Sequence, residues 1–360
     1  MLIKKLSILN FKNFAEFELE FSSKINCFVG NNGVGKTNLL DAIYYLSFTK
    51  SYFNHIDSQS IKHGEDFFMI QGEYERNEKQ EIIYCGLQKT KNKTFKRNDK
   101  KYNKFLEHIG LLPAVVVTPD DNKLIIGGSE ERRKFVDGVI SQYDKQYLNQ
   151  LIRYKRVLAQ RNQLFKNFAQ QKIFQPESVE VYNQQLVMFG EKIHKKRQQF
   201  IKDFLPSYQN YYNLISQNNE KVEITYNSQL NDGDFNELLA ESISKDRILQ
   251  YTTVGIHKDD LDFKLGDYKI KKTGSQGQQK TFLLALKFAQ YDVIKASLKI
   301  KPILLLDDIF DKLDALRVQQ IVKLVADENF GQIFISHTNL DRLENILSKI
   351  NTDYKIINLY

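Results

Sequence analysis

The chain has 360 residues, of which 42% are hydrophobic and 27% charged, an ordinary composition for a globular protein of one large or a few smaller domains. No apolar run approaches the roughly 18 residues of a membrane-spanning helix, and the first residues lack the apolar core of a signal peptide. With only 2 cysteines a disulfide framework is excluded, so we expect a cytoplasmic protein. The net charge of +8 is compatible with a nucleic-acid partner but does not establish one.

A glycine-rich turn between an expected strand and an expected helix dominates the N-terminal part. Residues 1–24 contain two strand-like patterns, and the apolar run 25–29 has the length of a buried strand. The turn itself consists of Gly30, Asn31, Asn32, Gly33, Val34 and Gly35. With Lys36 and Thr37 at the start of the helix, it fits the phosphate-binding pattern GxxxxGK[ST].

This turn predicts a site for the phosphates of ATP. Glycines allow successive backbone N–H groups to point at an anion, and the helix adds its unpaired N–H groups and its dipole. Lys36 would contact the β- and γ-phosphates, and the Thr37 hydroxyl would bind Mg²⁺. The alternative is a glycine turn ahead of an ordinary helix.

Strand-like runs between residues 66 and 87 lead into a basic segment, 89–104, that also carries aromatic residues. Such interleaving suits a nucleic-acid backbone and its bases. A solvated hairpin with its turn at Asn98 and Asp99 is the alternative. Residues 111–121 then read as a buried strand that ends at Pro119.

Residues 130–212 have a helical pattern in which only Pro176 and Pro206 are expected to act as breaks. We therefore predict several helices, forming a separate lobe. The region carries two basic patches, of which either could be only an exposed helix face. Their members are Arg153, Lys155, Arg156, Arg161 and Lys166 in the first, and Lys192, Lys195, Lys196 and Arg197 in the second.

Two acids follow the buried aliphatic run 303–306. Ligands of open α/β sheets lie outside the carboxyl ends of the strands, so Asp307 and Asp308 are expected beside a nucleotide held at Lys36. Asp307 suits a Mg²⁺ ligand, and Asp308 is a candidate to polarise the attacking water. The alternative is that both acids cap the next helix.

A Ser/Gly/Gln turn precedes this acidic strand. Ser275, Gly277 and Gln278 open an apolar helix and could form a second anion site, although the signal is weak by itself. The order of turn and acidic strand matches ABC-type ATPases, whose signature turn contacts the γ-phosphate held by the other subunit. His337 ends the next strand, where those ATPases often place a γ-phosphate-sensing histidine; a structural histidine is equally compatible.

Five stretches together resemble the RecF family of bacterial recombination-mediator ATPases, which is related to the SMC proteins. The resemblance runs nearly from end to end. The five stretches are GNNGVGKTNLLDAIYYLSF (30–48), VVVTPDDNKLIIGGSEERRKFVD (115–137), YKRVLAQRNQL (154–164), TTVGIHKDDLDF (252–263) and GSQGQQKTFLLALKFAQ (274–290).

The resemblance implies an α/β fold: an ABC-type ATPase head, that is, a P-loop NTPase with a mixed sheet and flanking helices, carrying an inserted, mostly helical second lobe. We expect residues 1–128 and 218–360 in the ATPase lobe and 129–217 in the helical lobe. It also implies an ATP-dependent homodimer, each ATP lying between the Lys36 loop of one copy and Ser275 of the other.

The function implied is that of a weak ATPase that binds DNA at gaps, cooperates with the RecR and RecO proteins, and acts in recombinational repair and the SOS response. One alternative is the nucleotide-binding subunit of an ABC transporter. Another is a scaffold that binds ATP without hydrolysing it.

Overall fold

The structure is a computed structural model that describes residues 1–54, 56–217, 220–310, 313–340, 344, 347–348 and 352–360. Its contacts divide the chain into two compact units. Unit 1 comprises Met1–Asp121, Leu214–Gln217 and Lys280–Tyr360. Unit 2 comprises Asn122–Asn213 and Asn218–Gln279.

A five-stranded sheet at the centre of unit 1 is parallel throughout and has the strand order β14-β3-β13-β12-β8. Its strands are β3 (Ile25–Val29), β8 (Ala114–Val117), β12 (Ile303–Asp307), β13 (Ile333–His337) and β14 (Tyr354–Asn358). The first four are buried along their whole length, as expected for strands covered on both faces. The buried strands predicted from the apolar runs are therefore confirmed.

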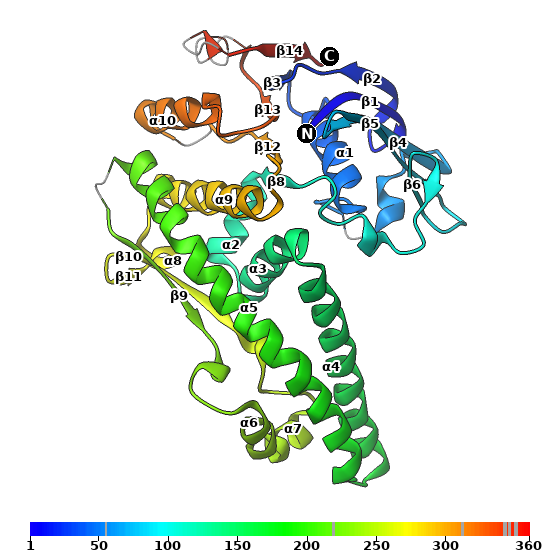
Figure 1. The fold of residues 1–360 in the computed structure, drawn as a ribbon, viewed down its shortest axis with the longest axis vertical. Coiled ribbons are helices and arrows are strands. Elements are labelled where there is room, and N and C mark those ends of the chain that lie inside the picture. Colours follow the sequence, from blue (N-terminus) through cyan, green and yellow to red (C-terminus); the bar gives the residue numbers. More distant parts are fainter. Residues whose placement is uncertain (55, 218–219, 311–312, 341–343, 345–346, 349–351) are drawn as a thin grey trace. The chain divides into compact units, whose positions relative to one another are not determined.

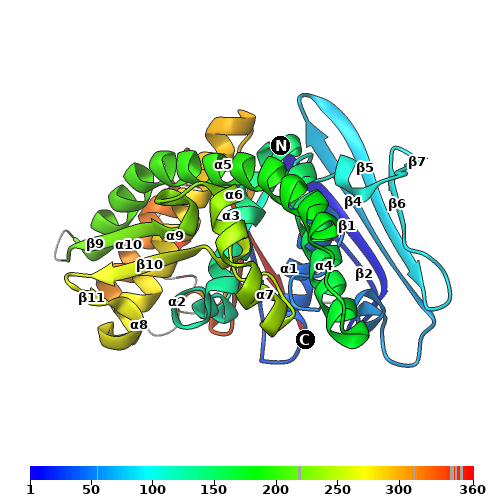
Figure 2. The same ribbon diagram turned by 90° about the horizontal axis from the view of Figure 1, so that it is seen from below.

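Unit 1 also contains an antiparallel sheet of six strands (Figure 2). Its order is β2-β1-β4-β5-β6-β7, and its strands are β1 (Leu2–Phe11), β2 (Phe14–Glu20), β4 (Phe67–Arg76), β5 (Lys79–Gln88), β6 (Thr94–Arg97) and β7 (Lys100–Lys101). Parallel and antiparallel strands thus lie in separate sheets. The basic segment 89–104 forms the predicted hairpin, with Asn98 and Asp99 at positive φ in its turn.

Helix α1 (Lys36–Phe48) contacts strands of both sheets, which explains why its buried residues are not confined to one stripe. Leu39, Leu40, Ile43 and Leu46 belong to one core cluster with residues of β1, β4 and β12. Two further helices of unit 1 are α9 (Gln276–Leu298), whose first residues belong to unit 2, and α10 (Ala315–Ala326).

Unit 2 consists of helices and a three-stranded sheet of order β11-β10-β9 (Figure 1). The helices are α2 (Lys123–Ile126), α3 (Ser129–Tyr143), α4 (Lys145–Gln171), α5 (Pro176–Ser216), α6 (Phe235–Glu241), α7 (Ile243–Leu249) and α8 (Ile270–Thr273). The strands are β9 (Val222–Asn227), β10 (Asp260–Leu265) and β11 (Tyr268–Lys269). Helices α4 and α5 lie side by side, joined by the bond from Arg161 Nε to Asn183 Oδ1 of 2.9 Å.

The predicted break at Pro206 is wrong, because α5 continues through this residue for 41 residues in all. Proline removes one backbone donor from a helix and usually ends or bends it. Here the rings of Phe204 and Tyr208, on either side of the proline, stack at 6.2 Å and are buried. Their packing supplies contacts that outweigh the lost hydrogen bond.

Residues 220–279 group with the helices of unit 2, because β10 packs against α3. The sequence-based division assigned this stretch to the ATPase lobe. Whether residues 129–217 fold independently of the ATPase lobe stays a prediction.

Candidate functional site

The glycine-rich turn leads from β3 into α1 with a backbone that only glycine adopts readily. Gly33 has φ +87° and Gly35 has φ +110°, both in the region where a Cβ is strained. A Cβ on Gly35 would also lie 2.6 Å from Asn13 Nδ2. Gly35 precedes α1 without a side-chain cap, so the first N–H groups of the helix are available to an anion.

Asn13 holds this turn from the β1–β2 connection. Its Nδ2 donates to the Val34 carbonyl at 2.9 Å, and its Oδ1 accepts from Asn38 Nδ2 at 2.8 Å. The prediction from sequence did not include Asn13. No local pattern marks it, since its role depends on Val34 of the glycine-rich turn, 21 residues away.

Lys36 is buried at the start of α1 and its side chain curls over the turn. Its Nζ donates to the carbonyl oxygens of Gly30 and Asn31 at 2.7 and 2.8 Å. Asn31 and Asn32 are exposed and Val34 is half-buried. The ammonium therefore stands inside the ring of backbone that Gly30–Gly35 forms, at the place where a phosphate-binding lysine is expected.

Thr37 and Asp307 meet at the carboxyl ends of the parallel strands. The Thr37 Oγ1 lies 3.0 and 2.9 Å from the two oxygens of Asp307. Ser336 Oγ donates to Asp307 Oδ1 at 2.5 Å, because Ser336 is the residue directly beside Asp307 in the β12–β13 register. Ser336 was not predicted from the sequence, because its contact with Asp307 depends on the register between two strands.

Burial raises the pKa of Asp307, while the hydrogen bonds from Ser336 and Thr37 and the charge of Lys36 oppose that shift. A buried carboxylate and an adjacent hydroxyl are the hard oxygen donors that Mg²⁺ prefers. A cation bound here would offset the free-energy cost of burying the charged Asp307 carboxylate. The residues present therefore fit a Mg²⁺ site with two protein ligands, Thr37 and Asp307.

Asp308 and His337 lie next to this pair. The Asp308 backbone has φ +44°, a costly value for a residue with a Cβ, and its N–H donates to Ser336 Oγ at 3.0 Å. His337 is buried, with Nδ1 4.0 Å from Asp308 Oδ1. The structure thus brings together five of the predicted side chains: Lys36, Thr37, Asp307, Asp308 and His337.

The Ser/Gly/Gln turn belongs to unit 2 and forms a reciprocal helix cap. Ser275 Oγ accepts from the Gln278 N–H at 3.2 Å, and Gln278 Oε1 accepts from the Ser275 N–H at 2.8 Å. Ser275 is exposed and Gly277 is half-buried within the first turn of α9. Gln278 Nε2 also donates to Glu220 Oε1 at 2.8 Å.

Asp41 of α1 is a further residue that the sequence analysis missed. Its side chain accepts from Ser51 Oγ at 2.7 Å, from the Tyr52 N–H at 2.7 Å and from Lys12 Nζ at 2.6 Å. The carboxylate is fully buried and all three donors converge on it. It fixes the segment after α1 to the helix that carries Lys36 and Thr37.

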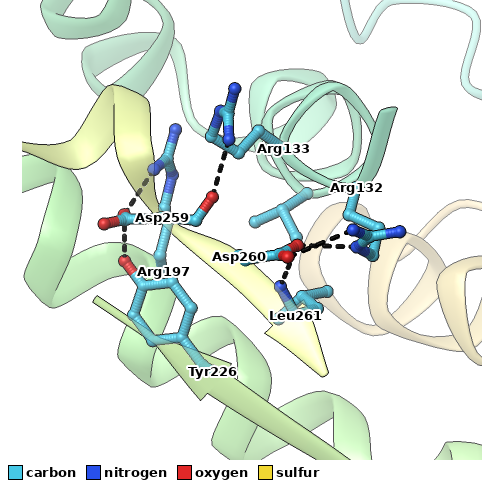
Figure 3. A pocket seen from close by; sticks show the side chains of 8 residues that line it. Arg132, Arg133, Arg197, Tyr226, Asp259, Asp260 and Leu261 are labelled. Carbon is cyan, nitrogen blue, oxygen red and sulfur yellow. Dashed lines mark hydrogen bonds and ion pairs between the residues drawn. The ribbon is translucent and has the colours of Figure 1, made fainter. Parts of the chain in front are cut away.

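The basic residues of the predicted patches divide into buried and exposed ones. Arg161 is fully buried, with Nη1 2.7 Å from Asp246 Oδ2. Arg197 is also buried; it bonds Asp259 at 2.6 Å (Figure 3) and Asp137 at 2.8 Å. In the hairpin, Lys93 Nζ contacts Asp57 at 2.6 Å. These three cations stabilise the fold and are not surface groups.

A small cavity next to Arg197 and Asp259 measures about 10 Å³, enough for about one water molecule. Arg133 donates to the Asp259 carbonyl at 2.7 Å, and Arg132 bonds Asp260 at 2.6 Å (Figure 3). Arg132 and Arg197 are paired with acids and Arg133 with a backbone carbonyl, so the cavity is part of a structural network. Among the helices that the structure describes, none has the length and hydropathy to cross a membrane.

Comparison with known proteins identifies the family. The chain matches the family described as RecF/RecN/SMC N terminal domain over residues 2–356. The DNA replication and repair protein RecF of Bacteroides thetaiotaomicron is 53% identical over 357 residues, 99% of this chain and 96% of that protein. The protein of the same name from Flavobacterium johnsoniae is 52% identical over 359 residues, 100% of both chains.

Solved structures agree with this. The structure described as the recombination mediator protein RecF-ATPrS in RecFOR pathway has a TM-score of 0.87 at 29% identity, covering 99% of this chain and 96% of that one. The corresponding RecF-ATP structure has a TM-score of 0.86 at 31% identity, covering 94% and 92%. An Smc head domain from Pyrococcus furiosus, at 18% identity with a TM-score of 0.58, shares the fold and covers 99% and 93%.

The predicted ABC-type ATPase head with an additional helical lobe is thereby confirmed, and the transporter alternative is not favoured. On sequence identity over the full length of both chains, the protein belongs to the RecF family of DNA replication and repair proteins.

Proposed function

We propose that this chain is an ATP-dependent DNA-binding protein of recombinational gap repair, a weak ATPase whose dimerisation on DNA is driven by ATP. The observation that carries the proposal is the meeting of Thr37 and Asp307 at 2.9 Å beside the Lys36 turn. Hydroxyl, carboxylate and lysine then surround one point at the end of the parallel sheet. This constellation suits a nucleoside triphosphate with Mg²⁺.

The residues of the site would have three roles: phosphate binding, metal binding and activation of water. The N–H groups of the turn and of the first residues of α1 would bind phosphate oxygens, with Lys36 adding a charge. Thr37 and Asp307 would hold Mg²⁺. ATP, when bound, supplies the γ-phosphoryl group, and Mg²⁺ neutralises its charge. Asp308 would orient the attacking water and accept its proton at a carboxylate oxygen, with His337 beside it.

We place Ser275, Gly277 and Gln278 at the γ-phosphate of a second copy. Among the hydrogen bonds of the described residues, Ser275 Oγ accepts one and donates none, so its O–H proton remains available to an anion. The turn is exposed and opens a helix of 23 residues, which supports an anion site there. Each ATP would then be shared between two copies, and dimerisation would depend on it.

DNA, RecO and RecR are the partners that we propose, in the cytoplasm. The support is that RecF relatives bear the name DNA replication and repair protein, and that a RecF structure is described as part of the RecFOR pathway. A scaffold that binds ATP without hydrolysing it is the alternative from another class.

Three measurements test the proposal: sedimentation, DNA affinity and single-turnover hydrolysis. Sedimentation velocity with and without ATP and Mg²⁺ should show a monomer that becomes a dimer, and DNA affinity should rise with the nucleotide. A monomer under both conditions, with unchanged DNA affinity, would contradict it. Single-turnover ATP hydrolysis should be lost in Lys36→Met and Asp308→Asn. Equal rates in the wild type and the variants would exclude catalysis by these residues and favour a scaffold that binds ATP without hydrolysing it.

A further inference from the structure

We propose that the exposed face of α4 binds the phosphate backbone of double-stranded DNA. This inference rests on the proposed DNA-binding function and names the surface and the form of DNA that it takes. It follows from the charges on α4, from the partners that these charges have, and from the residues that lie between them.

Helix α4 carries no acidic residue in 27 positions. Its basic residues are Lys145, Arg153, Lys155, Arg156, Arg161 and Lys166. Exposed helices usually mix both signs, because pairs three or four residues apart stabilise the helix. A long exposed helix whose charges are all positive lacks that stabilisation, and its side chains repel one another. Such a charge pattern is typical of a surface that binds a polyanion.

Of these six cations, Arg161 faces the interior and the other five face solvent; Lys145 lies at the first residue of the helix, and the other four lie further along it. Arg161 is neutralised by Asp246, as described above. Arg153, Lys155, Arg156 and Lys166 are exposed. Within the part of the chain that the structure describes, no carboxylate lies within 4.0 Å of these four cations. The acid whose pKa Lys155 helps to lower, Glu130, is already bonded to Lys134 at 3.0 Å.

The exposed face has hydrogen-bond donors but no aromatic ring. The aromatic residues of α4, namely Tyr147, Tyr154, Phe165 and Phe168, are all buried. The exposed amides Gln160 and Gln163 lie between the cations, and Asn167 and Gln170 follow Lys166. Lysine, arginine and amide side chains contact phosphate and sugar, whereas unpaired bases require aromatic rings to stack on. The face therefore suits the backbone of a duplex and lacks the aromatic rings on which unpaired bases stack.

The spacing of the cations allows several contacts at once. From Arg153 to Lys166 the helix rises about 20 Å, at 1.5 Å a residue. Along one strand of B-DNA the phosphates follow at about 3.4 Å of axial rise. The Arg153 guanidinium is steadied over the ring of Phe189, 6.0 Å from its centroid. The helix can thus contact phosphates over a substantial part of a helical turn.

The other two basic patches are partly neutralised within the protein. On α5, Lys196 Nζ lies 2.7 Å from Asp144, and the helix also carries Glu191 and Asp203. In the hairpin, Lys89 bonds Asp66 at 3.2 Å and Arg97 bonds Glu81 at 2.7 Å. Among the three patches, α4 has the exposed cations with the fewest internal partners.

The test compares Arg156→Gln/Lys166→Gln with a matched control, Lys192→Gln/Lys195→Gln, in the full-length chain with ATP and Mg²⁺. Both variants remove two exposed charges, one pair from α4 and the other from α5. Binding to a duplex and to a single strand of equal length is measured over a salt series. Thermal unfolding checks that both variants fold like the wild type.

We expect the α4 variant to bind the duplex more weakly, with the slope of log K against log salt reduced by about 2, since each phosphate contact contributes about 0.9. The α5 control should keep the wild-type slope. An unchanged slope in the α4 variant, or an equal loss in the control, overturns the inference. Wild-type binding to the single strand but not to the duplex also overturns it, while leaving the proposed function intact. Failure of the wild type to bind any DNA refutes the proposed function itself.

Discussion

Thr37 and Asp307 are 270 residues apart in sequence, yet the Thr37 hydroxyl lies 3.0 and 2.9 Å from the two carboxylate oxygens of Asp307. The first follows a glycine turn at the start of a helix, and the second ends a buried strand. Because β3, β13 and β12 are neighbouring parallel strands, their carboxyl ends meet at one edge. The pair defines where metal and nucleotide chemistry would occur.

Asp307→Asn should separate the charge of this residue from its hydrogen bonds. An amide oxygen still accepts from Ser336 and its NH₂ still reaches Thr37, so the fold is kept. Since burial disfavours the ionised carboxylate, the ligand-free variant should melt at the same or a higher temperature than the wild type. The added stability from Mg²⁺ and ATP, about 2.7 kcal/mol at 100 times Kd, should be lost.

Differential scanning calorimetry with and without Mg²⁺ and ATP measures both effects of Asp307→Asn. The control is Ser336→Ala, which removes a hydrogen bond but keeps the carboxylate. This control should retain the response to Mg²⁺. A normal Mg²⁺ response in Asp307→Asn would rule out Asp307 as a metal ligand.

Gly35→Ala should be more damaging than Gly33→Ala, although both glycines have positive φ. A Cβ on Gly33 meets no atom within 4 Å, so only the backbone strain of about 1–2 kcal/mol applies. A Cβ on Gly35 meets Asn13 Nδ2 at 2.6 Å and Phe14 Cζ at 2.7 Å, adding about 1–3 kcal/mol of overpacking. Urea unfolding and ATP titration compare the two, and equal costs would show that the contact with Asn13 is unimportant.

Arg161→Met should destabilise the protein by about 3–5 kcal/mol, because it leaves Asp246 buried without its partner. Arg156→Met, five residues earlier on the same helix, is the matched control. Arg156 is exposed, so its replacement should change the free energy of unfolding by less than about 0.5 kcal/mol. Chemical denaturation of both variants gives the comparison. A loss below 1 kcal/mol for Arg161→Met would mean that Asp246 finds another partner or is protonated.

His108 should make stability depend on pH in the acidic range. Burial lowers its pKa to about 4, and its Nε2–H donates to the Leu46 carbonyl at 2.7 Å. The unfolded chain has a histidine pKa near 6.5, so between about 6.5 and 4 the unfolded state binds more protons and acidification destabilises the fold. The contribution of His108 amounts to about 3 kcal/mol over this window.

Urea unfolding at several pH values tests the role of His108. His108→Gln should be less stable at pH 7 but should lose less stability on acidification than the wild type. The exposed His63→Gln is the control and should follow the wild-type curve. A pH dependence in His108→Gln equal to that of the wild type would assign the effect to other groups, such as His257, whose pKa is also lowered to about 4.

Several features of the candidate site could be predicted because their determinants are local. The GxxxxGK[ST] spacing describes one turn, whose glycines are needed for its own backbone. Buried parallel strands appear as short apolar runs, and Asp307 and Asp308 directly follow one of them. The capping pair of Ser275 and Gln278 is likewise contained in four residues.

Other features depend on which residues the folded chain brings together. Ser336 supports Asp307 through strand register, and Asn13 holds the glycine turn from another connection. Neither contact has a signature in the local sequence.

By itself, then, the sequence determined most of the elements, the glycine-rich turn and the acids of the candidate site, since each rests on periodicity or turn chemistry within a few residues. The tertiary structure alone decided the use of the basic residues: Arg161 and Arg156 are of one type on one helix, yet the first is buried against Asp246 and the second is exposed. It also decided that α5 passes through Pro206. The physical reason is that burial and pairing depend on distant segments, whose approach no local pattern encodes.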